Sequence, residues 1–145
     1  MVYPFGNAVN GVAHDGQGRW IAVGASPNDN ARSSSDGISW GSGGWTGLSL
    51  GLDVAHDQEG RWVTIGWHGG VATSTTAPGG SVWWNLVSYP HDRAVHGVAH
   101  DGDSRWVAVG AGATVARSSD GQTWTTVSYP HAGHINTIAA DRSAG

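Results

Sequence analysis

The residues with the clearest capacity for chemistry are His-Asp pairs that recur along the chain, namely His14-Asp15, His56-Asp57 and His100-Asp101. An imidazole beside a carboxylate can bind a metal ion or respond to pH near neutrality. The alternative is structural, because Asp before Gly-rich residues is typical of a turn and each His can bond its own turn. The regular recurrence favours the structural interpretation, so we expect no metal site.

A second group combines aromatic rings with His and Arg. Tyr-Pro opens the segments Tyr89-Pro90-His91-Asp92-Arg93 and Tyr129-Pro130-His131, and Trp67-His68 occurs once. Aromatic rings can stack on the C–H faces of sugars while polar neighbours bond the hydroxyls. Alternatively, Tyr-Pro only sets a turn and caps the core, and for the tyrosines we weigh both interpretations equally. The candidate ligand-binding residues are Trp67, His68, Tyr89, His91, Arg93, Tyr129 and His131.

These residues belong to a repeat. Residues 10–24, 52–66 and 96–110 align without gaps, and a further copy begins at 135–141. The anchors Val12, Val54, Val98 and Ile138 are 42, 44 and 40 residues apart. Each unit shows a short apolar strand, an Asp-Gly turn, an alternating β-branched strand, a third strand, a second tight turn and a fourth strand. Four short strands in each unit match the content of one propeller blade.

We therefore predict an all-β chain of three four-stranded antiparallel β-propeller blades, at about 7–50, 51–93 and 94–133, with an extra inner strand at 134–145. All of it forms one domain over residues 1–145. Three blades do not close a ring, since propellers typically have four to eight. We expect self-association into a closed ring, with a homodimer giving six blades. A β-trefoil is the alternative, because its three repeats of similar length close within one chain.

Two turns carry a family resemblance. The segments 34–40 (Ser-Ser-Asp-Gly-Ile-Ser-Trp) and 118–124 (Ser-Ser-Asp-Gly-Gln-Thr-Trp) resemble the Asp box of BNR-type β-propeller repeats. The resemblance implies a hairpin between the third and fourth strands of a blade, with the Trp packed over it. Both segments are one residue shorter than the usual box, and the corresponding segment 74–83 lacks the Asp. The chain is in this respect similar to propeller lectins and to non-catalytic sialidase-like propellers.

Because Asp-box proteins include sialidases, the resemblance also raises an enzymatic function. Such catalysis needs an Arg cluster for the substrate carboxylate, a Tyr with a Glu partner, and an acidic Asp. The single Glu is Glu59, in a turn that a propeller places opposite the usual binding side. Arginines recur once per unit, at Arg19, Arg61 and Arg105, which indicates a structural role. We expect no catalytic residues and no cofactor.

Composition limits the partners. The formal net charge is −4, the chain has no Lys, and no basic run supports nucleic-acid binding. No apolar stretch has the length of a membrane span, and no signal peptide is seen, which leaves cytoplasmic, leaderless-secreted and virion locations open. The predicted function is non-catalytic, multivalent binding of a glycan. The alternative is a structural component of a phage particle or an assembly scaffold, and a glycosidase-like enzyme comes third.

Overall fold

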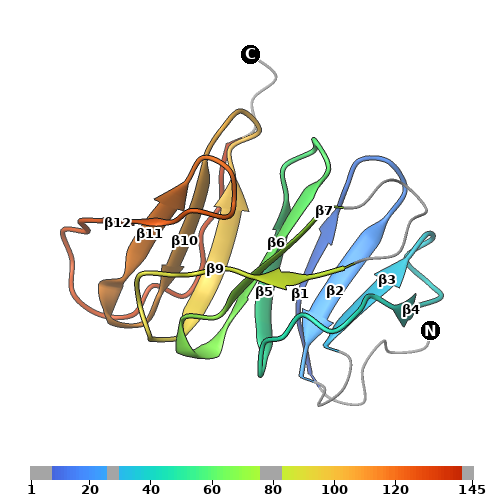
Figure 1. Ribbon diagram of the computed structural model, residues 1–145, viewed down its shortest axis with the longest axis horizontal. Helices are drawn as coiled ribbons and strands as arrows, with labels where there is room; N and C mark the ends of the chain where they lie inside the picture. Colours follow the sequence, from blue (N-terminus) through green and yellow to red (C-terminus); the bar gives the residue numbers. More distant parts are fainter. Residues whose placement is uncertain (1–7, 26–29, 76–82, 142–145) are drawn as a thin grey trace.

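The computed structural model describes residues 8–25, 30–75 and 83–141, and in these the chain is all-β. The strands form three separate four-stranded antiparallel sheets, which we call blades 1 to 3 (Figure 1). Blade 1 contains β1 (Val9–His14), β2 (Trp20–Gly24), β3 (Ala31–Ser34) and β4 (Gly41–Ser42). Blade 2 contains β5 (Gly51–His56), β6 (Arg61–Gly66), β7 (Val71–Thr75) and β8 (Asn85–Leu86). Blade 3 contains β9 (Val95–His100), β10 (Trp106–Gly110), β11 (Val115–Ser118) and β12 (Thr125–Val127). Short 3-10 turns, η1 (Trp67–Gly69) and η2 (Ala111–Ala113), follow β6 and β10.

The sequence repeat is also a repeat of strand register. In every blade the strands pair in chain order, and the His of the first strand lies opposite the Trp of the second. The second strand of each blade contains β-branched residues, which suits a strand that is paired on both sides. The predicted four-stranded units are confirmed. The β-trefoil alternative is wrong, because the strands form three independent sheets.

The core lies between the blades. The inner strands β1, β5 and β9 follow one another across the molecule (Figure 1). Trp62 of blade 2 packs in a buried cluster with Ile21 and Val23 of blade 1. Trp106 of blade 3 packs in the same way in a cluster that contains Val63 of blade 2. Blades 2 and 3 therefore each place their Trp against the blade before them, and burial of these large rings is a main source of stability.

Among the described residues, no blade packs against the same positions of blade 1. Val12 is 53% exposed, whereas the equivalent Val54 and Val98 are each 4% exposed. Trp20 is only partly buried, whereas Trp62 and Trp106 are fully buried. We call the contacts between neighbouring blades the seams. The outward face of blade 1 therefore exposes the kind of surface that is buried at the two seams.

Residues 134–141 lie where the extra inner strand was predicted, but they do not form a strand. Residues 134–141 pair with no other strand, and 142–145 lie outside the described residues. The Ile135 N–H donates to the Gly110 carbonyl at 3.1 Å. A Cβ on Gly97 would lie 3.2 Å from the Thr137 Cα, much as one on Gly11 would lie 2.9 Å from the Asp53 Cα. The segment therefore occupies the inner-strand place of a fourth unit, but no second strand lies beside it to complete a ladder.

Candidate functional site

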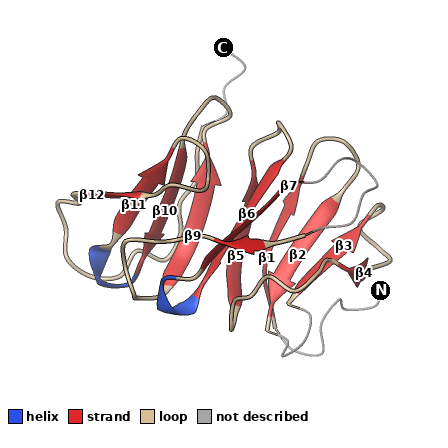
Figure 2. Cartoon of the chain, in the orientation of Figure 1, coloured by secondary structure: helices blue, strands red, loops and turns tan. Residues whose placement is uncertain are grey.

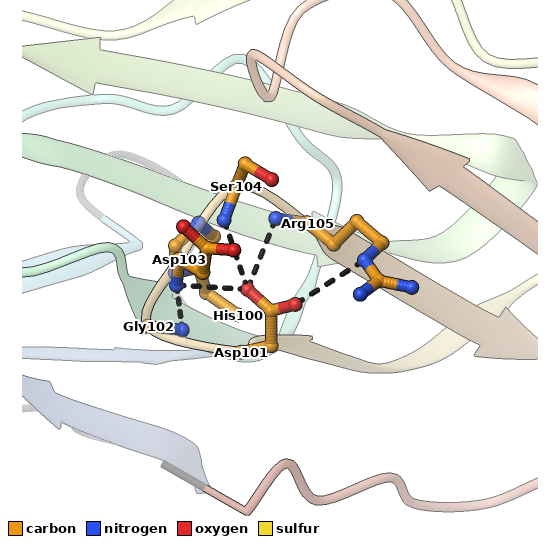
Figure 3. Close-up of polar contacts among 6 residues, drawn as sticks. All are labelled: His100, Asp101, Gly102, Asp103, Ser104 and Arg105. Atoms are coloured by element: carbon orange, nitrogen blue, oxygen red, sulfur yellow. Dashed lines mark hydrogen bonds and ion pairs between the residues drawn. The ribbon is translucent and has the colours of Figure 1, made fainter. Parts of the chain in front are cut away.

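The recurring His-Asp pairs close the turns between the first and second strands. The Nδ1 atoms of His14, His56 and His100 each accept a backbone N–H from two residues further on, at 3.0, 2.9 and 3.0 Å. Figure 3 shows the third turn, where Asp101 Oδ1 accepts three backbone N–H groups and Arg105 Nε lies 3.3 Å from Asp101 Oδ2. The backbone donors, that of Asp103 foremost, hold the pKa of Asp101 below its ordinary value. These bonds support the structural interpretation of the pairs.

The predicted binding loops come together at the other end of the blades. The Gly69 N–H of η1 donates to the Arg93 carbonyl at 2.7 Å. The Arg93 side chain runs beside η2, since a Cβ on Gly112 would lie 2.8 Å from Arg93 Nη1. The Gly112 N–H in turn donates to His134 Nδ1 at 3.0 Å. Figure 2 shows both 3-10 turns at the same edge of the sheets, and we call this edge the loop face.

Trp67 and His68 form the exposed tip of η1. Trp67 is 50% exposed, and the two rings meet edge to face with centroids 6.3 Å apart. His68 has φ 59°, a left-handed conformation that a residue with a Cβ adopts at some cost. The Gly66 N–H donates to the Gly70 carbonyl at 2.9 Å and the Gly70 N–H donates to the Trp67 carbonyl at 3.0 Å, so two bonds close the loop. The closed loop thus presents an aromatic ring and an imidazole together to solvent.

The two Tyr-His pairs have the same geometry but different surroundings. The ring centroids are 5.6 Å apart for Tyr89 and His91 and 5.7 Å apart for Tyr129 and His131. Tyr89 packs edge to face against Trp124 of blade 3, and burial raises its pKa to about 12. Tyr129 is 45% exposed. Tyr89 therefore serves as a packing residue at the seam, whereas Tyr129 offers an open ring.

Sequence reasoning missed two polar hollows beside the Ser-Asp-Gly turns at residues 34–37 and 118–121. In each turn the Ser Oγ accepts the Gly N–H at 2.8 Å, and the Asp Oδ1 accepts two further N–H groups. Beside the first is a hollow of about 350 Å³, and beside the second one of about 380 Å³. The second hollow is lined by Ser104, Arg105, Arg117, Ser118, Ser119, Thr123 and Thr125. In the sequence, these hollows are indicated by Arg and Ser residues that recur at equivalent positions of the repeat.

Three further tryptophans lie at the outer edge of blades 1 and 2. Trp84 Nε1 donates to the Gly43 carbonyl at 2.8 Å, which ties the outer part of blade 2 to blade 1. Trp45 is 49% exposed and Trp83 is 77% exposed. Trp84 is thus accounted for by packing, while Trp45 and Trp83 are additional aromatic surfaces that the sequence alone left unassigned.

Comparison with known proteins supports the fold. No family model matches the chain, and no curated protein matches it. Among solved structures, YCF48 from Cyanidioschyzon merolae, a β-propeller, superposes with a TM-score of 0.66 at 18% identity. The match covers 85% of this chain and 41% of that one, so this chain spans well under half of that protein. These are propeller blades. At this identity the likeness establishes architecture and carries no information about ligands.

The described residues limit the chemistry of the candidate site. No group of three or more His, Asp or Glu residues that could hold a metal ion is found in the described part of the chain. Within that part there is also no helix that could cross a membrane. Glu59 lies in the β5–β6 turn, at the opposite end of blade 2 from η1. The loop face presents exposed aromatic rings and hydrogen-bonding groups.

Proposed function

We propose that this chain is a non-catalytic, multivalent carbohydrate-binding propeller related to the Asp-box (BNR-type) repeat proteins. One observation carries the proposal: the loop face presents a half-exposed aromatic ring beside an imidazole at two separate points, Trp67 with His68 and Tyr129 with His131. A flat ring open to solvent is the feature that stacks on a sugar face, and a neighbouring imidazole can bond a hydroxyl.

The site at Trp67 and His68 has more polar neighbours than the site at Tyr129 and His131. A sugar stacked on Trp67 would have His68 at its edge and the Arg93 segment within the same loop cluster, because Gly69 bonds the Arg93 backbone. Arg93 supplies hydrogen-bond donors only, which favours hydroxyl or carboxylate oxygens of a sugar. Each site is open and shallow, so we expect weak single-site binding that gains strength when several sites engage one multivalent glycan.

Tyr89 and His91 belong to the proposed function indirectly. Their edge-to-face pair repeats the geometry of Tyr129 and His131, but Tyr89 is occupied by its contact with Trp124. We propose that Tyr89 holds the loop that carries Arg93 in place, rather than stacking on the ligand itself.

A glycan array followed by calorimetric titration of the best hit tests this proposal. Trp67→Ala is expected to weaken binding by about tenfold or more, since truncating an aromatic anchor removes most of its contact energy. Trp45→Ala is the matched control, because Trp45 is 49% exposed, close to the 50% of Trp67, and lies at the outer edge of blade 1. The proposal fails if no glycan binds, or if both substitutions reduce the affinity equally.

A second candidate function, an assembly scaffold or phage-particle component, is favoured by one separate observation. The outward face of blade 1 exposes Val12, whose equivalents are buried in the other blades. A protein that builds larger structures needs such an uncovered surface.

A further inference from the structure

The seam between blades 2 and 3 shows how neighbouring blades fit together. A Cβ on Gly121, in the Ser-Asp-Gly turn of blade 3, would lie 2.9 Å from Arg61 Cδ and 3.0 Å from Val63 Cγ2 of blade 2. The turn of the later blade therefore sits directly over the Arg and the β-branched residue of the earlier blade. Trp106 lies under the same turn, with its Nε1 3.4 Å from that Cβ position.

Blade 1 has the same kind of surface that blade 3 contributes to this seam, but no earlier blade among the described residues packs on it. We call Val12, Trp20 and Gly37 the tail face. A Cβ on Gly37 would meet only Trp20 Nε1 of its own blade, at 3.8 Å, whereas the equivalent Gly121 also meets Arg61 and Val63. Together with the 53% exposure of Val12, this leaves a surface shaped to pack against a blade that no blade among the described residues covers.

Blade 3 carries the earlier half of the seam, also uncovered at its outer part. We call Arg105, Val107 and Arg117 the head face. The Arg105 side chain is 66% exposed, and Val107 is partly exposed although its equivalents Ile21 and Val63 are fully buried. The hollow of about 380 Å³ is lined by Arg105 and Arg117, and the equivalent Arg61 lies under a Ser-Asp-Gly turn. An incoming Ser-Asp-Gly turn would lie over Arg105 in the way that the turn of blade 3 lies over Arg61.

We propose that copies of this chain associate head to tail, with the tail face of one copy seated on the head face of the next. The occupant is a second copy because its blade 1 presents the same Val, Trp and Ser-Asp-Gly turn that blade 3 presents to blade 2. Such a heterologous contact builds a closed ring when the rotation allows, and two copies supply six blades, within the range of known propellers.

The segment 134–141 occupies a surface of blade 3 next to the head face. It lies over Gly97 and Gly110, with Ile138 at the position that Val54 and Val98 hold at the internal seams. Strand β1 of an incoming copy needs the same place. Association therefore requires this segment to move aside, which makes the contact between copies weaker than the internal seams.

Sedimentation over a concentration series tests the proposal in the absence of any glycan. The expected result is a rise from the mass of one chain, 15.0 kDa, to that of two. Val12→Asp places a charge on the tail face and should hold the protein at one copy, whereas Leu86→Asp, at a 62% exposed position on blade 2, should not. Ile138→Asp loosens the competing segment and should shift association to lower concentration.

Mixing two defective variants tests the direction of the contact. The Val12→Asp protein lacks a working tail face, and a protein with Arg105→Glu and Arg117→Glu lacks a working head face. Each alone should stay a single chain, while the mixture should form one-to-one pairs through the remaining good contact. The proposal is overturned if wild type and Ile138→Asp both remain single at every concentration, if Val12→Asp and Leu86→Asp behave alike, or if the mixture gives no pairs. Each result leaves the proposed glycan site untouched, because that site is assayed separately.

Discussion

The three equivalent tryptophans provide a direct measure of what a neighbouring blade contributes. Each follows an Arg, is the first or second residue of its blade's second strand and contacts the His of its own first strand, with ring centroids 4.5, 4.4 and 4.7 Å apart in blades 1, 2 and 3. The exposed fraction is 0% for Trp62 and 1% for Trp106, whereas Trp20 is only partly buried. Truncation to Ala therefore removes the same local contacts in each case but different contacts across a seam.

We expect Trp62→Ala and Trp106→Ala each to lower the free energy of unfolding by about 3–5 kcal/mol, the usual cost of deleting a fully buried aromatic ring. Trp20→Ala should cost about 1–2 kcal/mol, because Trp20 is only partly buried and no blade among the described residues packs on its outward side. The measurement is urea unfolding followed by far-UV circular dichroism, at a concentration where sedimentation shows single chains. Equal costs at all three positions would refute the idea that the seams carry the stability.

Three further predictions concern single side chains. Ser118→Ala should lower the free energy of unfolding by about 1–2 kcal/mol, because the buried Gly121 N–H loses its acceptor, while the exposed neighbour Ser119→Ala should leave the urea midpoint unchanged. Backbone donors, that of Thr123 foremost, lower the pKa of Asp120, so its stabilisation is present above pH 3.8 and is lost as the pH falls through the lower folded value. Urea midpoints across the acid range should therefore fall less steeply for Asp120→Asn than for wild type. Burial raises the pKa of Tyr89 from 10.0 to about 12, so stability should fall between these pH values, and Tyr89→Phe should remove the latest phase of tyrosinate absorbance. A late phase that persists in that variant would contradict the packing role of Tyr89.

The fold was predictable because its signals are local and repeated. The spacing of Val12, Val54 and Val98, together with the Arg-Trp strands, places every blade. The candidate site was less predictable, because its geometry depends on contacts between blades. The role of Tyr89 is decided by Trp124 of the following blade, and no local pattern reveals that contact. Residues 134–141 lack strand structure for a similar reason: a strand is defined by its partner, which the described residues do not supply.

Asp53 limits which blades can be repeated side by side in an engineered array. Its carboxylate crosses a seam to accept the Val98 N–H at 3.1 Å, and the position that faces it from blade 1 is Gly11, where a Cβ would lie 3.0 Å from the Asp53 Oδ1. The units are therefore fitted individually and are not interchangeable modules. A tandem array made only from copies of blade 2 would place one Asp against the next at every seam, whereas an array of blade 3 copies, with Gly97 at this position, would not.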